Sequence, residues 1–272
     1  MTVRRILSPS GAEHADALRA GFAALTAELE LPAEFEPEVL GEIAAASAEG
    51  APAALAAGLI GAAEREDARA LPLVTLDPAG SRDLDQAFAI EPGSAPGTTV
   101  LHYAIADVAA HVVPGGAVEA ESLRRGETVY LPGRRVPLHP PQLSEDVASL
   151  LPGEERLAVL WTLTVDSQGE LTGVPQVRRA LVRSTAQLDY ASAQAALVAG
   201  RPHPQIAALA ELGPALQAAA VRRGAIELPE PEQELVETAG GGWALAWAPR
   251  APLEGWNAQL SLSTGRAAAG LM

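Results

Sequence analysis

Cysteine and lysine are both missing from the 272 residues of this chain. Without cysteine there is no disulfide, no thiolate zinc site and no cysteine nucleophile. All 19 basic residues are arginine, so the phosphate-binding lysine of a P-loop is missing too. The motifs GxSxG and HExxH do not occur, which argues against serine hydrolases and zinc proteases. Any metal must therefore be bound by oxygen or imidazole.

Basic charge and long apolar runs are also scarce. The formal net charge of −15 argues against a surface wholly devoted to nucleic acid, because phosphate contacts come from Arg and Lys, but it leaves room for a local basic channel. The longest apolar run, near residues 51–63, is too short to cross a bilayer, and the sequence shows no secretory leader. We therefore expect a cytoplasmic protein with no membrane partner.

The first seventy residues have the pattern of a small helical module. Apolar side chains recur near the helical period from Leu18 to Leu29. Further helices are predicted at residues 37–47 and 52–65, and the charged stretch 64–69 is predicted to be an exposed helix end or a linker. Such a module fits a helix-turn-helix-like nucleic-acid domain or a packing domain, and its acidic character favours the second.

From residue 71 the pattern changes to strands separated by Gly- and Pro-rich turns. Strands are predicted at residues 71–77, 85–91, 98–108, 156–166 and 174–184, and helices at 190–199 and 204–223. A short strand near residue 245 and the start of another helix follow. The order predicts an α+β protein, with a helical module over residues 1–70 and a mixed α+β domain over residues 71–272. The sequence stops inside this pattern, so we expect the domain to continue.

Three carboxylates lie within nine residues directly after the first predicted strand: Asp77, Asp83 and Asp85. Crowded carboxylates repel one another unless a cation neutralises them, and hard cations such as Mg²⁺ prefer oxygen ligands. The spacing fits a divalent metal site, and it equally fits a turn braced by Asx hydrogen bonds with Asp85 in solvent. An EF-hand does not fit, because the twelve-residue ligand ladder with its closing Glu is missing.

The surrounding sequence favours the metal site through its resemblance to a known family. The resemblance is carried by four runs in this order: VTLDPAGSRDLDQAF, HYAIADVAAHVVPGG, RRGETVYLPGRRVPLHPPQLSEDVASLLPGEERLAVLWTL and VRRALVRSTAQLDYASAQ. In order and spacing they resemble the RNB catalytic domain of ribonucleases II and R. The resemblance extends from about residue 71 to the end and implies an RNB-type domain that is incomplete at its C-terminus.

The resemblance implies a hydrolytic 3′-to-5′ exoribonuclease that degrades single-stranded RNA processively to nucleoside 5′-monophosphates with Mg²⁺, or with Mn²⁺. The acidic loop of the family holds four aspartates. The first three match Asp77, Asp83 and Asp85, which are thereby implied as catalytic residues and metal ligands. The fourth matches Gln86, which offers one carbonyl oxygen and no charge, so we expect weaker Mg²⁺ binding. On an extended strand Gln86 would face away from Asp83 and Asp85, so either the loop is irregular or Gln86 is not a ligand.

The same resemblance implies a path for RNA. Tyr130 matches a tyrosine that stacks on a base near the 3′ end of the RNA, and the arginines that flank it could contact phosphates: Arg124, Arg125, Arg134 and Arg135. The structural alternative makes Tyr130 a core aromatic and the arginines solubilising surface residues. Asp107 matches a family position for which we expect a structural role.

Two functions remain open on the sequence. The arginine-bearing segment with which the family contacts the scissile phosphate, and its S1-type barrel, are not found in residues 1–272. The chain is therefore interpreted as the front part of an active, Mg²⁺-dependent exoribonuclease. The alternative is a catalytically impaired RNB scaffold that binds RNA or acts in regulation.

Overall fold

The structure, a computed structural model, describes residues 6–7, 12–32, 34–47, 65–131, 134–226, 232–237, 243–248 and 250–272. Contacts divide the chain into two compact units, each drawn from several parts of the sequence. One comprises residues 1–42, 113–140 and 228–250, and the other, larger unit comprises residues 43–112, 141–227 and 251–272. The domain boundary at residue 70 is based on the change from a helical to a strand pattern in the sequence, and it stays a prediction.

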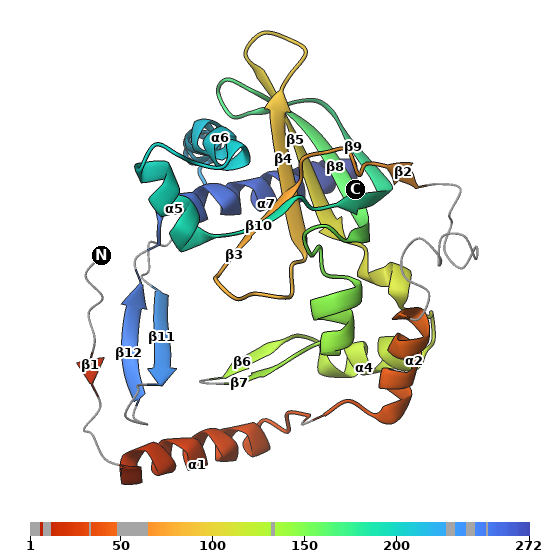
Figure 1. Cartoon of the computed structure of the whole chain (residues 1–272), viewed down its shortest axis with the longest axis vertical. Coiled ribbons are helices and arrows are strands. Elements are labelled where there is room, and N and C mark those ends of the chain that lie inside the picture. Colours follow the sequence, from red (N-terminus) through yellow and green to blue (C-terminus); the bar gives the residue numbers. More distant parts are fainter. Residues whose placement is uncertain are drawn as a thin grey trace. The chain divides into compact units, whose positions relative to one another are not determined.

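The larger unit is built on a seven-stranded mixed sheet with the order β10-β3-β4-β5-β8-β9-β2 (Figure 1). The strands are β2 (Glu66–Asp67), β3 (Val74–Asp77), β4 (Gln86–Pro92), β5 (Thr98–Ala106), β8 (Glu155–Asp166), β9 (Leu171–Arg183) and β10 (Ala186–Asp189). The pairs β10–β3 and β2–β9 are parallel, and the other pairs are antiparallel. Two short helical turns, Val108–His111 and Leu143–Val147, complete this part. The predicted α+β class is confirmed.

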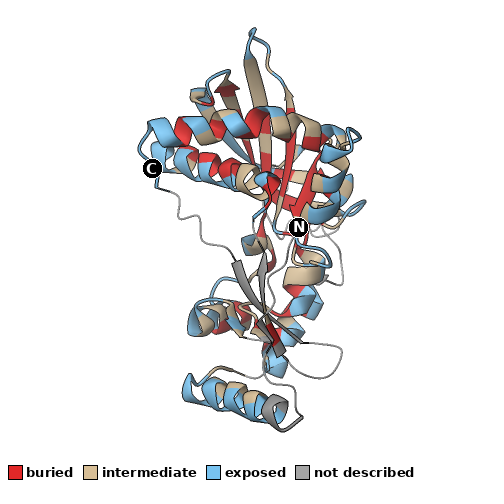
Figure 2. Ribbon diagram, turned by 90° about the vertical axis from the view of Figure 1, so that its left-hand side faces the viewer, coloured by how far each residue is buried: buried red, intermediate tan, exposed pale blue. Residues whose placement is uncertain are grey.

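The two faces of this sheet carry different side chains, because successive residues of a strand point to opposite sides. One face has large apolar residues such as Phe88, Leu101 and Leu163, in one core with residues of three helices. These helices are α5 (Tyr190–Val198), α6 (Pro204–Arg222) and α7 (Pro252–Leu271). Figure 2 shows the buried positions gathered in the strands and on the helix sides turned to them. The other face is lined mainly by small residues, including Ala87, Ala89, Ala104, Ala106, Ala158 and Ala180.

The other unit combines short helices with small sheets. Its helices are α1 (Ala12–Glu28), the first half of α2 (Pro37–Ser47), up to Glu42, and α4 (Ala117–Arg125). Its sheets are the hairpin of β6 (Val129–Leu131) with β7 (Arg134–Val136) and a three-stranded sheet of β1 (Ile6–Leu7), β12 (Trp243–Ala248) and β11 (Glu232–Glu237). The Glu42 carboxylate accepts a backbone hydrogen bond from Ala117 at 2.6 Å. It thereby caps α4, whose own N-cap residue, Gly116, has no side chain.

Most predicted elements are present. The predicted helix at residues 37–47 and the strands and helices predicted between residues 71 and 223 are confirmed. The third predicted helix, at residues 52–65, lies mostly outside the described residues. The prediction for residues 64–69 is wrong at Glu66 and Asp67, which form a strand parallel to β9. The strand forms because Ala68 is buried and its N–H donates a hydrogen bond to the carbonyl oxygen of Leu181 at 2.9 Å. This contact holds the stretch against β9.

No helix in the described part of the chain is both long and apolar enough to cross a bilayer.

Candidate active site

The acidic loop occupies residues 78–85, between β3 and β4, and has no regular secondary structure. Gly80 has a φ of 86°, in the left-handed region that favours glycine. The N–H of Ser81 bonds the carbonyl oxygen of Pro78 at 3.2 Å, which closes the turn. The backbone of the loop is therefore irregular, so the alternation of an extended strand does not decide where Gln86 points relative to Asp83 and Asp85.

A segment far along the chain holds the loop in place. The Ser149 hydroxyl donates to the carbonyl oxygen of Arg82 at 2.5 Å and accepts from the N–H of Leu84 at 3.1 Å. The N–H of Leu150 donates to the Leu84 carbonyl oxygen at 2.8 Å, and the Leu84 side chain is fully buried. Because Leu84 lies between two of the aspartates, its anchoring fixes the backbone that carries their carboxylates.

Asp77 and Asp85 share a cavity of about 190 Å³. Asp77 is the last residue of β3, and Asp85 ends the loop just before β4. Gln86, the first residue of β4, also lines the cavity, whereas Asp83 does not. The remaining lining residues are Leu76, Phe88, Tyr103, Tyr190 and Asn257. The structure thus brings together three of the four predicted metal-binding residues.

Three polar lining residues were missed by the sequence reasoning. The Asn257 amide donates to the Tyr190 hydroxyl at 2.8 Å, and the Tyr103 hydroxyl donates to Oε1 of Gln86. Tyr190 follows β10, whose parallel pairing with β3 sets Asp189 opposite Asp77. One signal was available, because the chain has only three tyrosines and two of them line this cavity.

The electrostatic cost of the site is concentrated at Asp77. Its Oδ2 atom is buried and has no hydrogen-bond partner among the described residues. Burial, followed by repulsion from Asp85 and Asp83, raises the pKa of Asp77 to about 6. Asp85 is accessible to solvent at the cavity, yet partial loss of hydration raises its pKa, and Asp83 adds to the effect. A bound cation would stabilise both ionised carboxylates.

The donor set fits a hard divalent cation. Within the described ranges, no three His, Asp or Glu side chains gather closely enough to form a complete metal cage. Mg²⁺ does not require one, because it is usually bound by one or two carboxylates together with substrate phosphates and water. Asp77 and Asp85 match that pattern, since they share one cavity and Asp77 keeps a buried oxygen without a partner.

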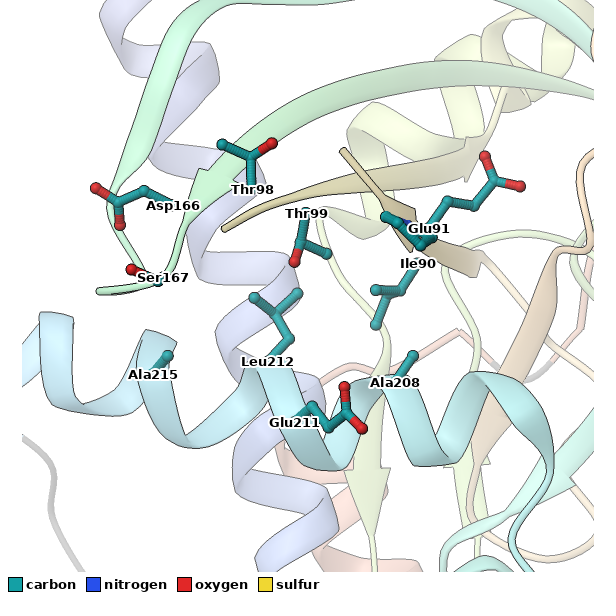
Figure 3. A pocket seen from close by; sticks show the side chains of 11 residues that line it. Ile90, Glu91, Thr98, Thr99, Asp166, Ser167, Ala208, Glu211, Leu212 and Ala215 are labelled. Carbon is teal, nitrogen blue, oxygen red and sulfur yellow. The ribbon is translucent and has the colours of Figure 1, made fainter. Parts of the chain in front are cut away.

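A second, larger cavity of about 290 Å³ lies at the other end of β4 (Figure 3). Glu91, Asp166 and Glu211 are its acidic lining residues. Asp166 is already engaged, because its Oδ1 accepts backbone hydrogen bonds from Gln168 at 2.8 Å and Glu170 at 2.9 Å. We therefore place the candidate chemistry in the smaller cavity, where the buried oxygen of Asp77 has no hydrogen-bond partner in the described part of the chain.

Tyr130 and the predicted RNA-binding arginines lie in the other compact unit. Tyr130, on β6, is 74% exposed, which rules out the alternative of a core aromatic. Its direct cross-strand neighbour on β7 is Arg135. Arg134 pairs with Leu131 in the same hairpin, and its side chain lies outside the described part. The hairpin therefore presents an exposed aromatic ring next to an arginine position.

Arg124 and Arg125 are adjacent in sequence but differ in their surroundings. The Arg125 guanidinium lies 3.7 Å from the centre of the Phe35 ring and donates to the carbonyl oxygens of Pro137 at 3.0 Å and Glu34 at 2.7 Å. Only 2% of its side chain is exposed. Arg124 makes an ion pair within α4 and keeps 55% of its side chain exposed. Arg125 thus stabilises the fold through its contacts with Phe35, Pro137 and Glu34, whereas Arg124 is accessible to a ligand.

Asp107 has the buried surroundings of a structural group. Its carboxylate accepts a hydrogen bond from Arg65 at 2.8 Å, and the two side chains are 4% and 2% exposed. Arg179 approaches the same carboxylate at 3.7 Å. This pair joins the residue before β2 to the residue after β5, in keeping with the structural role expected for Asp107.

The mixed sheet, the three helices on one face and the acidic loop beside a small cavity define a catalytic domain of the RNB type. The RNB domain family matches residues 65–244. The chain belongs to this family, and the resemblance seen in the sequence is confirmed.

Bacterial ribonucleases are among the proteins similar to this chain. Exoribonuclease 2 of Mannheimia succiniciproducens is 38% identical over 130 residues, which is 46% of this chain and 20% of that protein. Ribonuclease R of Acidithiobacillus ferrooxidans is 36% identical over 209 residues, which is 72% of this chain and 44% of that protein. Among solved structures, Mycoplasma genitalium RNase R in complex with ribose-methylated single-stranded RNA matches with a TM-score of 0.78 and 25% identity, over 89% of this chain and 37% of that one. The chain spans less than half the length of these relatives.

Proposed function

We propose that this chain belongs to a 3′-to-5′ exoribonuclease that hydrolyses single-stranded RNA to nucleoside 5′-monophosphates. The observation that carries the proposal is the small cavity where Asp77, with its unpaired buried oxygen, meets Asp85. Membership of the RNB family and relatives named exoribonuclease 2 and ribonuclease R support it. In this proposal residues 1–70 form an N-terminal module, residues 71–272 belong to the catalytic domain, and the enzyme acts in the cytoplasm.

Asp77, Asp83 and Asp85 are the proposed catalytic residues and would hold Mg²⁺ or Mn²⁺. A bound cation would polarise the scissile phosphate and lower the pKa of water. Asp77 and Asp85 concentrate negative charge where the cation and a phosphate would meet. The anchored Leu84 backbone keeps these charges in place, so little reorganisation is needed when substrate binds.

Tyr130, Arg124, Arg134 and Arg135 are the proposed contacts for RNA near its 3′ end. Base stacking on an aromatic side chain contributes about 1–3 kcal/mol per base and tolerates any sequence. The 74% exposure of Tyr130 leaves its ring available for such stacking. Repeated stacking and phosphate contacts of this kind would keep the strand bound between cleavages, which is the basis for proposing processive degradation.

One observation favours the second function, an RNA-binding scaffold with impaired catalysis. Gln86, at the position of the family's fourth aspartate, brings no charge to the loop. The cation would then be bound weakly, and RNA could be retained without being cleaved.

The two functions are separated by an assay on the full-length protein that contains this chain. Single-stranded RNA with a labelled 3′ end is incubated with Mg²⁺, and mononucleotide release is followed for the wild type and for Asp85→Asn. Asp16→Asn is the matched control, because this aspartate is 76% exposed on α1 and takes no part in the cavity.

Release by the wild type and by Asp16→Asn, together with loss of release in Asp85→Asn, is the expected result. Equal release by all three proteins would contradict the role given to Asp85. Release that persists in the presence of a chelator would contradict the role of the metal. RNA binding without any release by the wild type would support the scaffold function instead.

A further inference from the structure

A row of paired residues runs across the sheet of the larger unit from the acidic cavity to an arginine. The strands β4, β5, β8 and β9 are consecutive neighbours in this sheet (Figure 1). The residues paired along the row are, in this order, Gln86, Ile105, Val159 and Arg179. Directly paired residues of antiparallel strands point to the same face, and Gln86 lines the cavity. Arg179 therefore lies on the face of the sheet that carries the cavity.

This row is accessible to solvent, whereas the row beside it is covered by the helices. The neighbouring row contains Phe88, Tyr103 and Trp161, which are at most 9% exposed and belong to the core shared with the helices. Ile105, in contrast, is 36% exposed, and the Arg179 side chain is 52% exposed. Three steps between neighbouring strands cover about 14 Å. A strand of RNA that ends in the cavity can therefore extend over Ile105 and reach Arg179 within a few nucleotides.

The positive charge of Arg179 is available to a ligand because the neighbouring carboxylate is already paired. Asp107 accepts a hydrogen bond from Arg65 at 2.8 Å, whereas the Arg179 guanidinium lies 3.7 Å from the same carboxylate. Arg65 and Asp107 are both buried, so Arg179 is the accessible member of a group with two positive charges and one negative charge. A guanidinium held in this way suits a phosphate, because its planar set of N–H donors matches two phosphate oxygens.

We propose that Arg179 binds a backbone phosphate of single-stranded RNA, on the 5′ side of the linkage that lies at the acidic cavity. Ile105 and Val159 would lie beneath the nucleotides between these two points. The inference rests on the proposed function, because it concerns the RNA that enters this cavity. Arg179 is thereby a positioning residue: a second fixed point on the strand reduces the freedom of the 3′ end beside the carboxylates.

The test measures the binding of a short single-stranded RNA by fluorescence anisotropy, on the full-length protein that contains this chain. A chelator is present so that the RNA stays intact, which a gel confirms. Arg179→Met removes the charge, and Arg179→Lys keeps it. Arg178→Met is the matched control, because Arg178 is 41% exposed and pairs with Leu160 on the opposite face of the same strands. Thermal unfolding confirms that every variant is folded.

Arg179→Met is expected to weaken RNA binding by roughly two- to tenfold at low salt, the effect of one partly exposed charged contact. The slope of log K against log[salt] should decrease in magnitude by about 0.7, as for the loss of one phosphate contact with a single strand. Arg179→Lys should keep the slope, and Arg178→Met should behave as the wild type in both measurements.

A second measurement locates the phosphate. The RNA is made with one uncharged methylphosphonate linkage, which is moved one position at a time from the 3′ end. In the wild type, a linkage inside the strand, and not the terminal one, should be sensitive to this change. In Arg179→Met, neutralising the same linkage should cause no further loss of affinity, because both changes remove the same contact.

Equal RNA affinity of Arg179→Met and Arg178→Met would overturn the inference. Additive effects of Arg179→Met and the methylphosphonate at every linkage would also overturn it, because they would indicate long-range attraction and no contact. A wild type that binds no RNA would overturn it as well. Failure of the proposed function alone looks different, since RNA binding would still depend on Arg179 while the wild type releases no mononucleotide with Mg²⁺.

Discussion

Asp77→Asn is predicted to stabilise the metal-free protein while it removes the metal site. In the folded chain, burial and the neighbouring Asp85 and Asp83 raise the pKa of Asp77 from 3.8 to about 6. An acid whose pKa is higher in the folded state binds its proton more tightly there, so its ionisation favours unfolding. Asparagine keeps the size and polarity of the side chain and removes this charge.

The magnitude follows from the shift in pKa. A shift of about two pKa units corresponds to about 3 kcal/mol, and the partial exposure of Asp77 reduces this to about 2–3 kcal/mol. The cost is fully present above about pH 6, falls to about half near pH 5 and vanishes below about pH 4, where Asp77 is protonated in both states. For a chain of this size the midpoint of thermal unfolding should rise by about 4–10 °C at pH 8.

The assay is thermal and urea unfolding in the presence of a chelator, at about pH 8 and about pH 5, for the wild type and Asp77→Asn. Asp146→Asn is the control in the same unit, because its side chain is 68% exposed. Added Mg²⁺ should stabilise the wild type and leave Asp77→Asn unchanged, because only the folded wild type binds the ion. A variant no more stable than the wild type at pH 8, or a gain equal at both pH values, would refute the electrostatic reasoning.

Three further predictions concern the loop anchor, the buried Asp107–Arg65 pair and the two neighbouring arginines of α4. Ser149→Ala should lower the free energy of unfolding by about 1–3 kcal/mol in urea, because it leaves backbone groups of the acidic loop without their partner; an unchanged midpoint would show that the anchor is dispensable. Asp107→Asn should cost about 3–5 kcal/mol, since it leaves the buried Arg65 guanidinium without its counter-charge, and adding Arg65→Met should restore much of the loss in the same denaturation experiment. Arg125→Met should destabilise the protein, whereas Arg124→Met should leave the free energy of unfolding unchanged. Arg124→Met should instead weaken the retention of single-stranded RNA in a filter-binding assay at low salt. The opposite pattern would contradict the contacts described for the two arginines.

Local sequence pattern predicted the parts of the fold that depend on neighbouring residues. The helix at residues 37–47 follows from its apolar period, and the strands around the acidic loop follow from short apolar runs between turns. The short strand at Glu66 and Asp67 could not be found this way. Its two charged residues carry no strand pattern, and only its pairing with β9 makes it a strand.

The residues of the candidate site likewise fall into those that local sequence predicts and those that only the fold brings together. Asp77 and Asp85 were found because their crowding within nine residues is visible in the sequence. Asn257 reaches the cavity only through the packing of α7 and leaves no local signal. Tyr190 reaches it through the pairing of β10 with β3, and only the rarity of tyrosine in the chain marked it. The burial of Arg125 depends on Phe35, which is ninety residues away, so its sequence position beside exposed Arg124 was no guide.

The cavity is closed by residues from both ends of the larger unit, and this has a consequence for protein synthesis. Asp77 leaves the ribosome about 180 residues before Asn257, which at cellular rates of elongation corresponds to roughly 10–40 s. During that interval the acidic loop can be synthesised and its strands paired, but the wall formed by α7 does not yet exist. A nascent chain therefore carries the carboxylates of Asp77 and Asp85 before the wall that encloses them has been made.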